Sequence, residues 1–288
     1  MPLRRLLLLL AVGLAGCASS SRVDLAFPTA AASRVQLVDS NRLVVGSFLY
    51  APPGPGPFPA VVLSHTCGGL RRHVFEWAER LVAAGYVALV IDHLGPRSLT
   101  NNCPPDNAVS ANEFAEDAAA ALEHLRGRSL VDPGRVAHMG FSYGAMAGVR
   151  LASRTFQRLW LGGRRFQAVI AFYPWCGEYG PGPERNLYPD IETPLLLILG
   201  ADDDETPPGV CVEAASRIAE RGRPIAWKVY PGTTHSFDSS IMGDRSFTRP
   251  LPGGRTTTYR YNRQSTEDAW RESREFLARH LKGGAPER

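Results

Sequence analysis

The most informative segment of the chain is Arg135-Val136-Ala137-His138-Met139-Gly140-Phe141-Ser142-Tyr143-Gly144, in which an apolar run leads into a serine between two glycines. Residues 135–141 are typical of a buried strand, and helical spacing of apolar residues follows from 143 to about 153. A G-x-S-x-G turn between a strand and a helix is so tight that small residues must flank the serine, whose hydroxyl is left exposed. We therefore interpret Ser142 as a candidate nucleophile. The alternative is an ordinary glycine-rich turn, because the chain has 28 Gly.

Strand and helix patterns alternate along the chain. Apolar runs typical of buried strands lie at residues 60–64, 86–91, 168–173, 194–199 and 225–230. Helical spacing of apolar residues is found at 74–82, 113–125, 210–219 and 269–281. This alternation predicts an α/β fold with a mostly parallel sheet covered by helices on both faces. We expect an antiparallel pair at residues 35–49 on the sheet edge, and a loop near the site at 239–261, where no period is clear.

The bulk composition is that of an ordinary globular protein. A chain of 288 residues suits one large α/β domain, and its hydrophobic content of 44% and charged content of 21% are unremarkable for this class. The net charge of +4 includes Arg4 and Arg5, which belong to a segment that we expect to be removed. No block of like charges is present, so we expect no nucleic-acid partner.

The N-terminus has the pattern of an export signal. Residues 1–5 are a short basic start, and residues 6–14 are an apolar run too short to span a bilayer. Leu14-Ala15-Gly16-Cys17 then resembles a bacterial lipoprotein signal, which implies removal of residues 1–16 and lipidation of Cys17. Ala18 in place of Asp implies an outer-membrane anchor facing the periplasm. We expect a flexible tether at 17–32 and the domain at 33–288; an ordinary signal cleaved after Ala18 is the alternative.

Export changes the interpretation of the cysteines. With Cys17 lipidated, Cys67, Cys103, Cys176 and Cys211 remain, and an even number in an oxidising compartment favours disulfides. Cys67 and Cys103 follow two strands that we expect to be adjacent, and Cys176 and Cys211 follow another such pair, so we favour these pairings. Four buried free thiols are the alternative. A metal site is not expected, because no C-x-x-C spacing and no accompanying histidine pair is present.

A serine nucleophile needs a histidine base and an acid that orients it. In an elbow fold these follow in the order serine, acid, histidine. Only His235 and His280 follow Ser142, and His280 lies in the predicted closing helix, whereas His235 lies in a loop after the strand at 225–230. The acid is expected in the loop after the strand at 194–199, but the order alone leaves Asp202, Asp203 and Asp204 open.

Five segments together resemble one protein family. They are Gly140-Phe141-Ser142-Tyr143-Gly144, Gly200-(x2)-Asp203-Asp204-(x)-Thr206-Pro207, Tyr230-Pro231-Gly232-(x2)-His235-(x)-Phe237-Asp238, Ser64-His65-Thr66-Cys67-Gly68-Gly69 and Asp92-(x2)-Gly95-Pro96-Arg97. Over residues 60–238 the chain resembles the dienelactone hydrolase family of α/β-hydrolases. This resemblance implies the α/β-hydrolase fold and hydrolysis of small carboxylic esters or lactones, with no cofactor.

The resemblance also selects the acid. In that family the orienting acid stands four residues before the proline, which implies Asp203 and hence the triad Ser142, Asp203 and His235. One position departs from the family pattern, because the founding members carry cysteine where this chain has Ser142. We therefore expect general ester or lactone hydrolysis rather than a preference for dienelactone.

The remaining site residues are expected around the elbow. The backbone N–H of Tyr143 follows the nucleophile and is one expected oxyanion donor, and the resemblance implies Cys67 as the other. Arg97 is a candidate for binding a substrate carboxylate, with pairing to a surface acid as its alternative. Trp175 and Tyr173 are candidates for lining the pocket, with packing in the core as theirs.

The favoured function is a membrane-anchored serine hydrolase that forms an acyl-enzyme on a small-molecule ester or lactone. Two other classes stay open: a serine peptidase of the prolyl-peptidase type, and a non-catalytic binding lipoprotein on the same fold. The sequence does not indicate the oligomeric state.

Overall fold

The computed structural model describes residues 33–38, 44–104, 107–177 and 187–281. The expected signal at 1–16, the lipidation site Cys17 and the tether at 17–32 lie outside the described residues, so these three expectations stay predictions.

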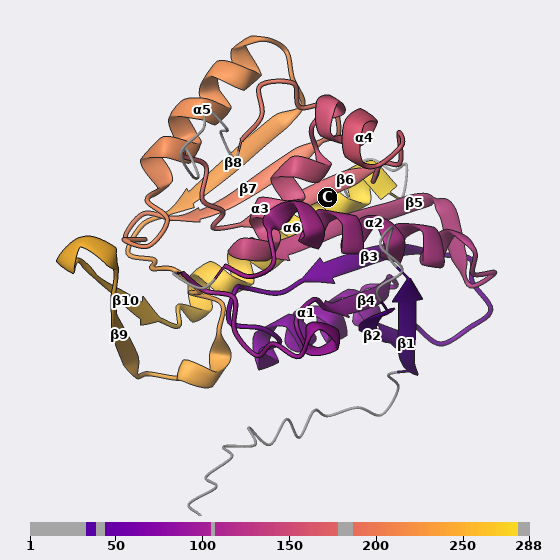
Figure 1. Cartoon of the computed structure of the whole chain (residues 1–288), viewed down its shortest axis with the longest axis horizontal. Coiled ribbons are helices and arrows are strands. Elements are labelled where there is room, and N and C mark those ends of the chain that lie inside the picture. The colour runs from indigo at the N-terminus through magenta and orange to yellow at the C-terminus, as the bar shows by residue number, and fades with distance from the viewer. Residues whose placement is uncertain (1–32, 39–43, 105–106, 178–186, 282–288) are drawn as a thin grey trace, which may run out of the picture.

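One sheet organises the described residues (Figure 1). Its eight strands lie in the order β1-β2-β4-β3-β5-β6-β7-β8. Their bounds are β1 (Ser33–Val38), β2 (Val44–Tyr50), β3 (Phe58–Ser64), β4 (Val87–Asp92), β5 (Val131–Phe141), β6 (Ala168–Phe172), β7 (Leu195–Gly200) and β8 (Ile225–Tyr230). Neighbours from β4 to β8 are parallel, whereas β2 is antiparallel to both β1 and β4. The expected α/β class and antiparallel edge pair are confirmed.

Helices cover both faces of the sheet. α1 (Arg72–Ala83) and α6 (Arg263–Leu281) pack on one face, where Trp77 and Phe276 belong to one hydrophobic core. α2 (Ala111–Arg126), α3 (Tyr143–Leu151) and α5 (Pro208–Glu220) pack on the other, with Phe114 and Ala215 in a second core. The central strands are buried on both faces because each face meets helices, which explains their continuous apolar runs.

Short elements complete the chain. They are η1 (Gly95–Arg97), α4 (Arg154–Trp160), η2 (Ser240–Met242) and η3 (Pro252–Gly254). In the sheet register Ser64 pairs with Gly140, and Phe141 pairs with Phe172. The carboxyl ends of β3, β5 and β6 therefore lie at one edge, which is where open α/β sheets bind ligands.

The prediction of a loop without regular structure at 239–261 is wrong. After η2 the chain forms an antiparallel hairpin of β9 (Ser246–Pro250) and β10 (Thr256–Arg260), which projects beyond the main sheet (Figure 1). Both strands are short, β9 is mostly exposed, and the one buried residue of β10 is polar, so they lack the apolar alternation that predicts a strand. The β-branched run at 256–258 and the Gly253-Gly254 turn were the available signal.

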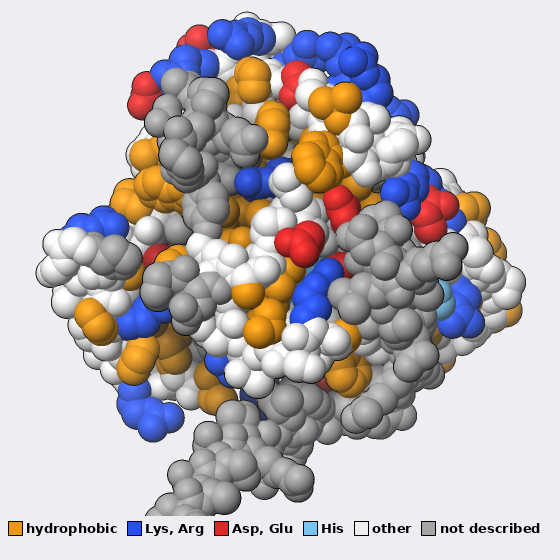
Figure 2. All heavy atoms as spheres, viewed as in Figure 1, with side chains coloured by type: hydrophobic (Ala, Val, Ile, Leu, Met, Phe, Trp, Pro, Cys, Tyr) orange, Lys and Arg blue, Asp and Glu red, His pale blue; other side chains and the backbone are white. Residues whose placement is uncertain are grey.

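The described surface mixes side-chain types. On the face shown in Figure 2, hydrophobic, basic and acidic side chains are interspersed. Within the described part of the chain, no helix combines the length and apolar character that a membrane span requires.

Candidate active site

The turn at Ser142 has the strained geometry expected of an elbow. Ser142 has φ 51° and ψ −109°, a conformation that residues other than glycine rarely adopt. A Cβ on Gly140 would lie 2.2 Å from the Gly144 carbonyl oxygen, and one on Gly144 would lie 2.3 Å from the Ser64 carbonyl oxygen. Both glycines are therefore required by close backbone approach, and the serine is held between β5 and α3.

Three loops at the carboxyl edge bring the predicted residues together. The Nε2 atom of His235, in the loop after β8, lies 3.0 Å from Ser142 Oγ. Its Nδ1 atom lies 2.7 Å from Oδ2 of Asp203, in the loop after β7. Asp203 is buried, whereas Asp202 and Asp204 are exposed. The structure thus selects Asp203 as the carboxylate that contacts the histidine.

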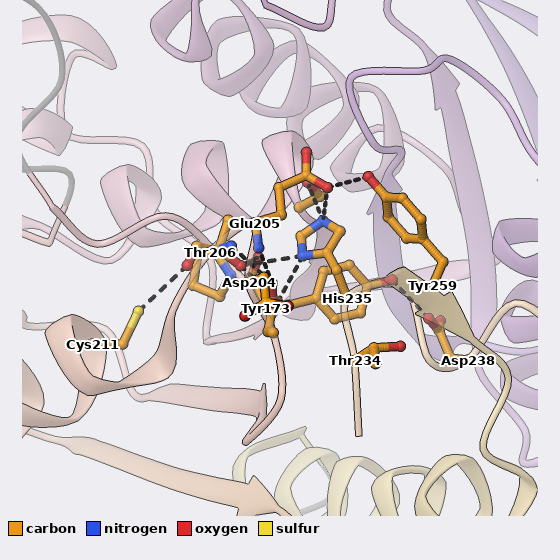
Figure 3. Close-up of polar contacts among 12 residues, drawn as sticks. Tyr173, Asp204, Glu205, Thr206, Cys211, Thr234, His235, Asp238 and Tyr259 are labelled. Carbon is orange, nitrogen blue, oxygen red and sulfur yellow. Dashed lines mark hydrogen bonds and ion pairs between the residues drawn. The ribbon is translucent and has the colours of Figure 1, made fainter. Parts of the chain in front are cut away.

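Asp203 is fixed by its own loop. Its Oδ1 atom accepts hydrogen bonds from the backbone N–H groups of Glu205 at 2.9 Å and Thr206 at 2.8 Å. The Thr206 hydroxyl donates to Oδ2 at 2.8 Å, and it lies beside the His235 ring (Figure 3). With these partners the carboxylate can accept from His235 in only one orientation. Sequence reasoning assigned no role to Thr206.

A second carboxylate, Glu205, lies beside the same histidine. Its Oε2 atom is 3.8 Å from His235 Nε2. Arg249 of β9 donates to Oε1 at 2.6 Å, and the Tyr259 hydroxyl of β10 donates to Oε2. In Figure 3 Glu205 lies between the His235 ring and Tyr259, with dashed lines to both. Glu205 therefore links the hairpin to the loop that carries Asp203.

Charge controls the protonation of His235. Burial lowers its pKa, but the negative charges of Asp203 and Glu205 outweigh burial and raise the pKa to about 8. Arg249 acts in the opposite direction. His235 is consequently neutral, and able to accept a proton from Ser142, mainly above this pH.

Tyr173 belongs to the core beneath the site rather than to a pocket. It is fully buried at φ 42°, and its hydroxyl donates to Asp238 Oδ1 at 2.7 Å. Trp77 Nε1 donates to Asp238 Oδ2 at 2.8 Å. The Tyr173 ring packs against His235 with 4.6 Å between ring centroids. The core alternative is therefore the correct one for Tyr173, and the ring supports the histidine.

Of the two expected oxyanion residues, Tyr143 directly follows Ser142 and Cys67 lies in the loop after β3. Tyr143 begins α3, and Gly144 N–H donates to the His65 carbonyl at 3.0 Å, which joins α3 to the loop after β3. In that loop the Cys67 carbonyl accepts from Asn102 N–H at 2.7 Å. Cys67 and Ser142 line the same two hollows.

Arg97 does not take the substrate-binding place that we expected. Its guanidinium donates to Asp117 Oδ2 at 2.8 Å and Oδ1 at 3.1 Å, and to the His93 carbonyl at 2.8 Å. Asp117 is fully buried, so the pairing alternative holds with an interior acid in place of a surface one. Asp117 Oδ2 also lies 2.8 Å from His93 Nδ1, and Ser64 Oγ contacts His93 and His138 at 3.0 and 2.9 Å. This buried network lies beneath the start of the Cys67 loop.

Both predicted disulfides are present. Cys67 is bonded to Cys103, and Cys176 is bonded to Cys211. The first bridge braces the loop that carries Cys67, and the second links α5 to the segment after β6. Among the described residues, no group of three or more His, Cys, Asp or Glu side chains could hold a metal ion.

Comparison with known proteins now gives the family. The model described as "Dienelactone hydrolase family" matches residues 45–281. The chain belongs to this family. It is 31% identical over 225 residues to an uncharacterised protein of Mycobacterium tuberculosis, covering 73% of this chain and 74% of that one.

Two solved structures share the fold of this family member. A putative dienelactone hydrolase from Klebsiella pneumoniae superposes with a TM-score of 0.64 at 19% identity, over 86% of this chain and 98% of the other. An esterase from Thermogutta terrifontis with bound propionate gives a TM-score of 0.63 at 15% identity, over 87% of this chain and 94% of the other.

Two hollows open beside Ser142 in this dienelactone hydrolase family member. The hairpin hollow has a volume of about 370 Å³ and is bordered by His235, Phe247 and Tyr259, among others. The Trp175 hollow has a volume of about 230 Å³ and is bordered by Trp175, Met146 and Tyr143, among others. Trp175 therefore lines a pocket at the serine, as expected. The sequence did not predict that the hairpin borders one of these hollows or that Glu205 lies beside His235.

Proposed function

We propose that this protein is a serine hydrolase that cleaves small carboxylic esters or lactones through an acyl-enzyme. One observation carries the proposal: Ser142 Oγ, His235 and Asp203 form a continuous hydrogen-bonded chain, with contacts of 3.0 and 2.7 Å. That arrangement activates a serine for acyl transfer. The membership of the dienelactone hydrolase family and the fold shared with an esterase support the same reaction.

The acylation step follows from the geometry. His235 Nε2 accepts the proton of Ser142 as Oγ attacks the carbonyl carbon, and Asp203 stabilises the imidazolium that forms. The carbonyl oxygen becomes negative and is stabilised by the backbone N–H groups of Tyr143 and Cys67. When the intermediate collapses, the bond from carbon to the alcohol oxygen breaks, and His235 delivers its proton to that oxygen.

The deacylation step repeats the chemistry with water. A water molecule gives a proton to His235 and attacks the acyl carbon of the ester on Ser142. Collapse of this second intermediate breaks the bond to Oγ, which receives the proton back from His235. The products are a carboxylic acid and an alcohol, or a hydroxy acid when the substrate is a lactone.

Replacement of the nucleophile tests the proposal. Ser142→Ala should lower kcat for p-nitrophenyl acetate by about 10⁶-fold, as in comparable triads, with little change in melting temperature. Ser129→Ala, at an exposed serine, is the matched control and should behave as wild type. A folded Ser142→Ala protein that keeps its activity would refute the assignment.

The proposed place of action is the periplasmic face of the outer membrane, with a lipid on Cys17. The support is the sequence Leu14-Ala15-Gly16-Cys17 after an apolar run, together with two disulfides, which persist in oxidising compartments. Intact mass spectrometry of membrane-extracted protein should show diacylglyceryl and acyl groups on Cys17. A free N-terminus at Ser19 would instead indicate an ordinary secretory signal.

A further inference from the structure

The two hollows meet at the catalytic serine but differ in the residues around them. Three residues border both hollows: Cys67, Ser142 and Glu205. His235 borders only the hairpin hollow. Tyr143 and Trp175 border only the Trp175 hollow. An ester bound at Ser142 can therefore place its two ends in chemically different surroundings.

The chemistry of the reaction determines which end of the ester lies in which hollow. His235 must give its proton to the departing alcohol oxygen, so that oxygen has to lie on the side of the tetrahedral carbon that faces His235. The oxyanion takes a second direction, toward the backbone of Cys67 and Tyr143. The acyl chain takes the direction that remains. The alcohol therefore extends into the hairpin hollow, and the acyl chain extends into the Trp175 hollow.

Two exposed apolar side chains stand at the rim of the hairpin hollow, beside the charged side chains of Arg71 and Arg249. Five large hydrophobic side chains are exposed among the described residues, and two of them, Ile241 and Phe247, border this hollow. Their exposed fractions are 62% and 60%. Phe247 lies across the hairpin from Tyr259, with 5.9 Å between the ring centroids. Apolar groups gathered at the mouth of a site indicate a binding surface more than singly scattered ones do.

The Trp175 hollow is the smaller of the two. Its volume of about 230 Å³ compares with about 370 Å³ on the hairpin side. Met146 is buried on α3, and Trp175 is half-buried, with the bridge of Cys176 next to it in the chain. The smaller hollow therefore favours a shorter group than the hairpin hollow does.

The charged side chain of Glu205 lies where the hairpin hollow and the Trp175 hollow meet. Its carboxylate borders both hollows and is held by Arg249 and Tyr259 of the hairpin. Arg71 also borders the hairpin hollow and Arg255 borders the Trp175 hollow, so cations balance the charge of Glu205 on both sides.

We propose that the preferred substrates are esters of a short apolar acid with a larger, aromatic alcohol, and that the hairpin provides the alcohol subsite. This inference rests on the proposed function. It makes the hairpin of residues 246–260 the element that determines specificity.

Two series of esters, one varied in the alcohol and one in the acyl chain, test the assignment of the subsites with the wild-type enzyme. Methyl, benzyl and 2-naphthylmethyl acetates have alcohols of similar acidity, so differences among them report binding rather than leaving-group chemistry. We expect kcat/KM to rise by about tenfold or more along this series, because the added ring buries apolar surface. In a second series with a constant p-nitrophenyl group, we expect kcat/KM to fall from butyrate to octanoate.

Matched variants locate the two subsites. Phe247→Ala should lower kcat/KM for 2-naphthylmethyl acetate several-fold more than for methyl acetate, mainly through KM. Trp175→Ala should extend the accepted acyl length without changing the alcohol preference. Leu159→Ala, an exposed side chain of α4 that borders neither hollow, is the control and should leave both series unchanged.

The outcomes separate this inference from the proposed function. If esters are hydrolysed but Phe247→Ala leaves the naphthylmethyl-to-methyl ratio unchanged, the alcohol subsite is not on the hairpin and the inference fails. A wild-type preference for long acyl chains would overturn it as well. If the folded wild-type protein hydrolyses no ester of either series, the proposed function itself fails.

Discussion

The Glu205 carboxylate lies 3.8 Å from His235 Nε2, the same nitrogen that lies 3.0 Å from Ser142 Oγ. The atom that we propose as the proton acceptor therefore lies near a second negative charge, in addition to that of Asp203 on Nδ1. Burial lowers the pKa of His235, and the two carboxylates more than offset it, giving a value of about 8. Activity should consequently rise as the pH increases through this value, because only neutral His235 can act as the base.

Opposite charge changes should move this pH dependence in opposite directions. Glu205→Gln removes a charge that raises the pKa of His235, so the midpoint of kcat/KM against pH should move to lower pH. Arg249→Met removes a charge that lowers this pKa, so the midpoint should move to higher pH. Tyr259→Phe removes a contact to Glu205 without a charge change and is the control. Superimposable profiles for all three variants would contradict the electrostatic account.

Asparagine substitutions in the loop after β7 should show that only one of its three aspartates is needed for activity. Asp203→Asn should lower kcat by about 10⁴-fold, as in other triads, because the amide favours the wrong histidine tautomer. Asp202→Asn and Asp204→Asn should retain nearly full activity, since both side chains are exposed. Steady-state kinetics on p-nitrophenyl acetate measure all three. Loss of activity in the Asp204 variant with retention in the Asp203 variant would contradict the structure.

The two disulfides should affect activity differently while contributing similarly to stability. They join residues separated by 36 and 35 positions, so chain entropy predicts a similar stabilisation of about 2–4 kcal/mol for each. Cys67→Ser with Cys103→Ser should lower kcat as well as the melting temperature, because Cys67 carries a proposed oxyanion donor. Cys176→Ser with Cys211→Ser should lower mainly the melting temperature. Equal losses of kcat in both double variants would argue against a special role for the first bridge.

Buried histidines should make the protein less stable in mild acid. Burial is the main cause that lowers the pKa of His65 and of His138 to about 3. A lowered folded-state pKa gives stability that is present above the unfolded value of about 6.5 and is lost as the pH falls. At pH 5 the loss is about 2 kcal/mol for each of the two. His235, whose pKa is raised, contributes in the opposite sense, with its stabilisation lost as the pH rises through about 8.

Urea unfolding at pH 7 and pH 5 measures this loss. His138→Gln should reduce the difference between the two pH values, because one of the groups that must be protonated on unfolding is removed. Equal unfolding free energies at both pH values in the wild type would contradict the prediction.

Much of the fold could be predicted because buried parallel strands leave a strong local signal. β8 has the predicted bounds, β4 and β7 are each shifted by one residue, and β3 begins two residues earlier than predicted. The hairpin of β9 and β10 could not be predicted in the same way, because its exposed strands are stabilised by contacts with Glu205 rather than by an apolar face. Local periodicity carries no information on such contacts.

The site residues likewise divide into those that short sequence segments predict and those that depend on tertiary packing. The strand–turn–helix context predicted Ser142, and chain order with family spacing predicted Asp203 and His235, because these depend on short segments; the structure brings the three side chains into contact. The role of Arg97 depends on Asp117, which reaches it from α2 through tertiary packing. The inward direction of Glu205, within a run of four acids, likewise depends on the folded loop.

Covalent labelling with a fluorophosphonate tests the proposed acyl transfer directly, because the reagent reacts with the nucleophilic oxygen. The native protein is labelled, and peptide mapping then locates the adduct. We expect one adduct, on Ser142 Oγ, that forms in proportion to the loss of esterase activity and is suppressed by p-nitrophenyl acetate. A protein that hydrolyses esters while Ser142 stays unmodified, with the adduct on another residue, would contradict the account.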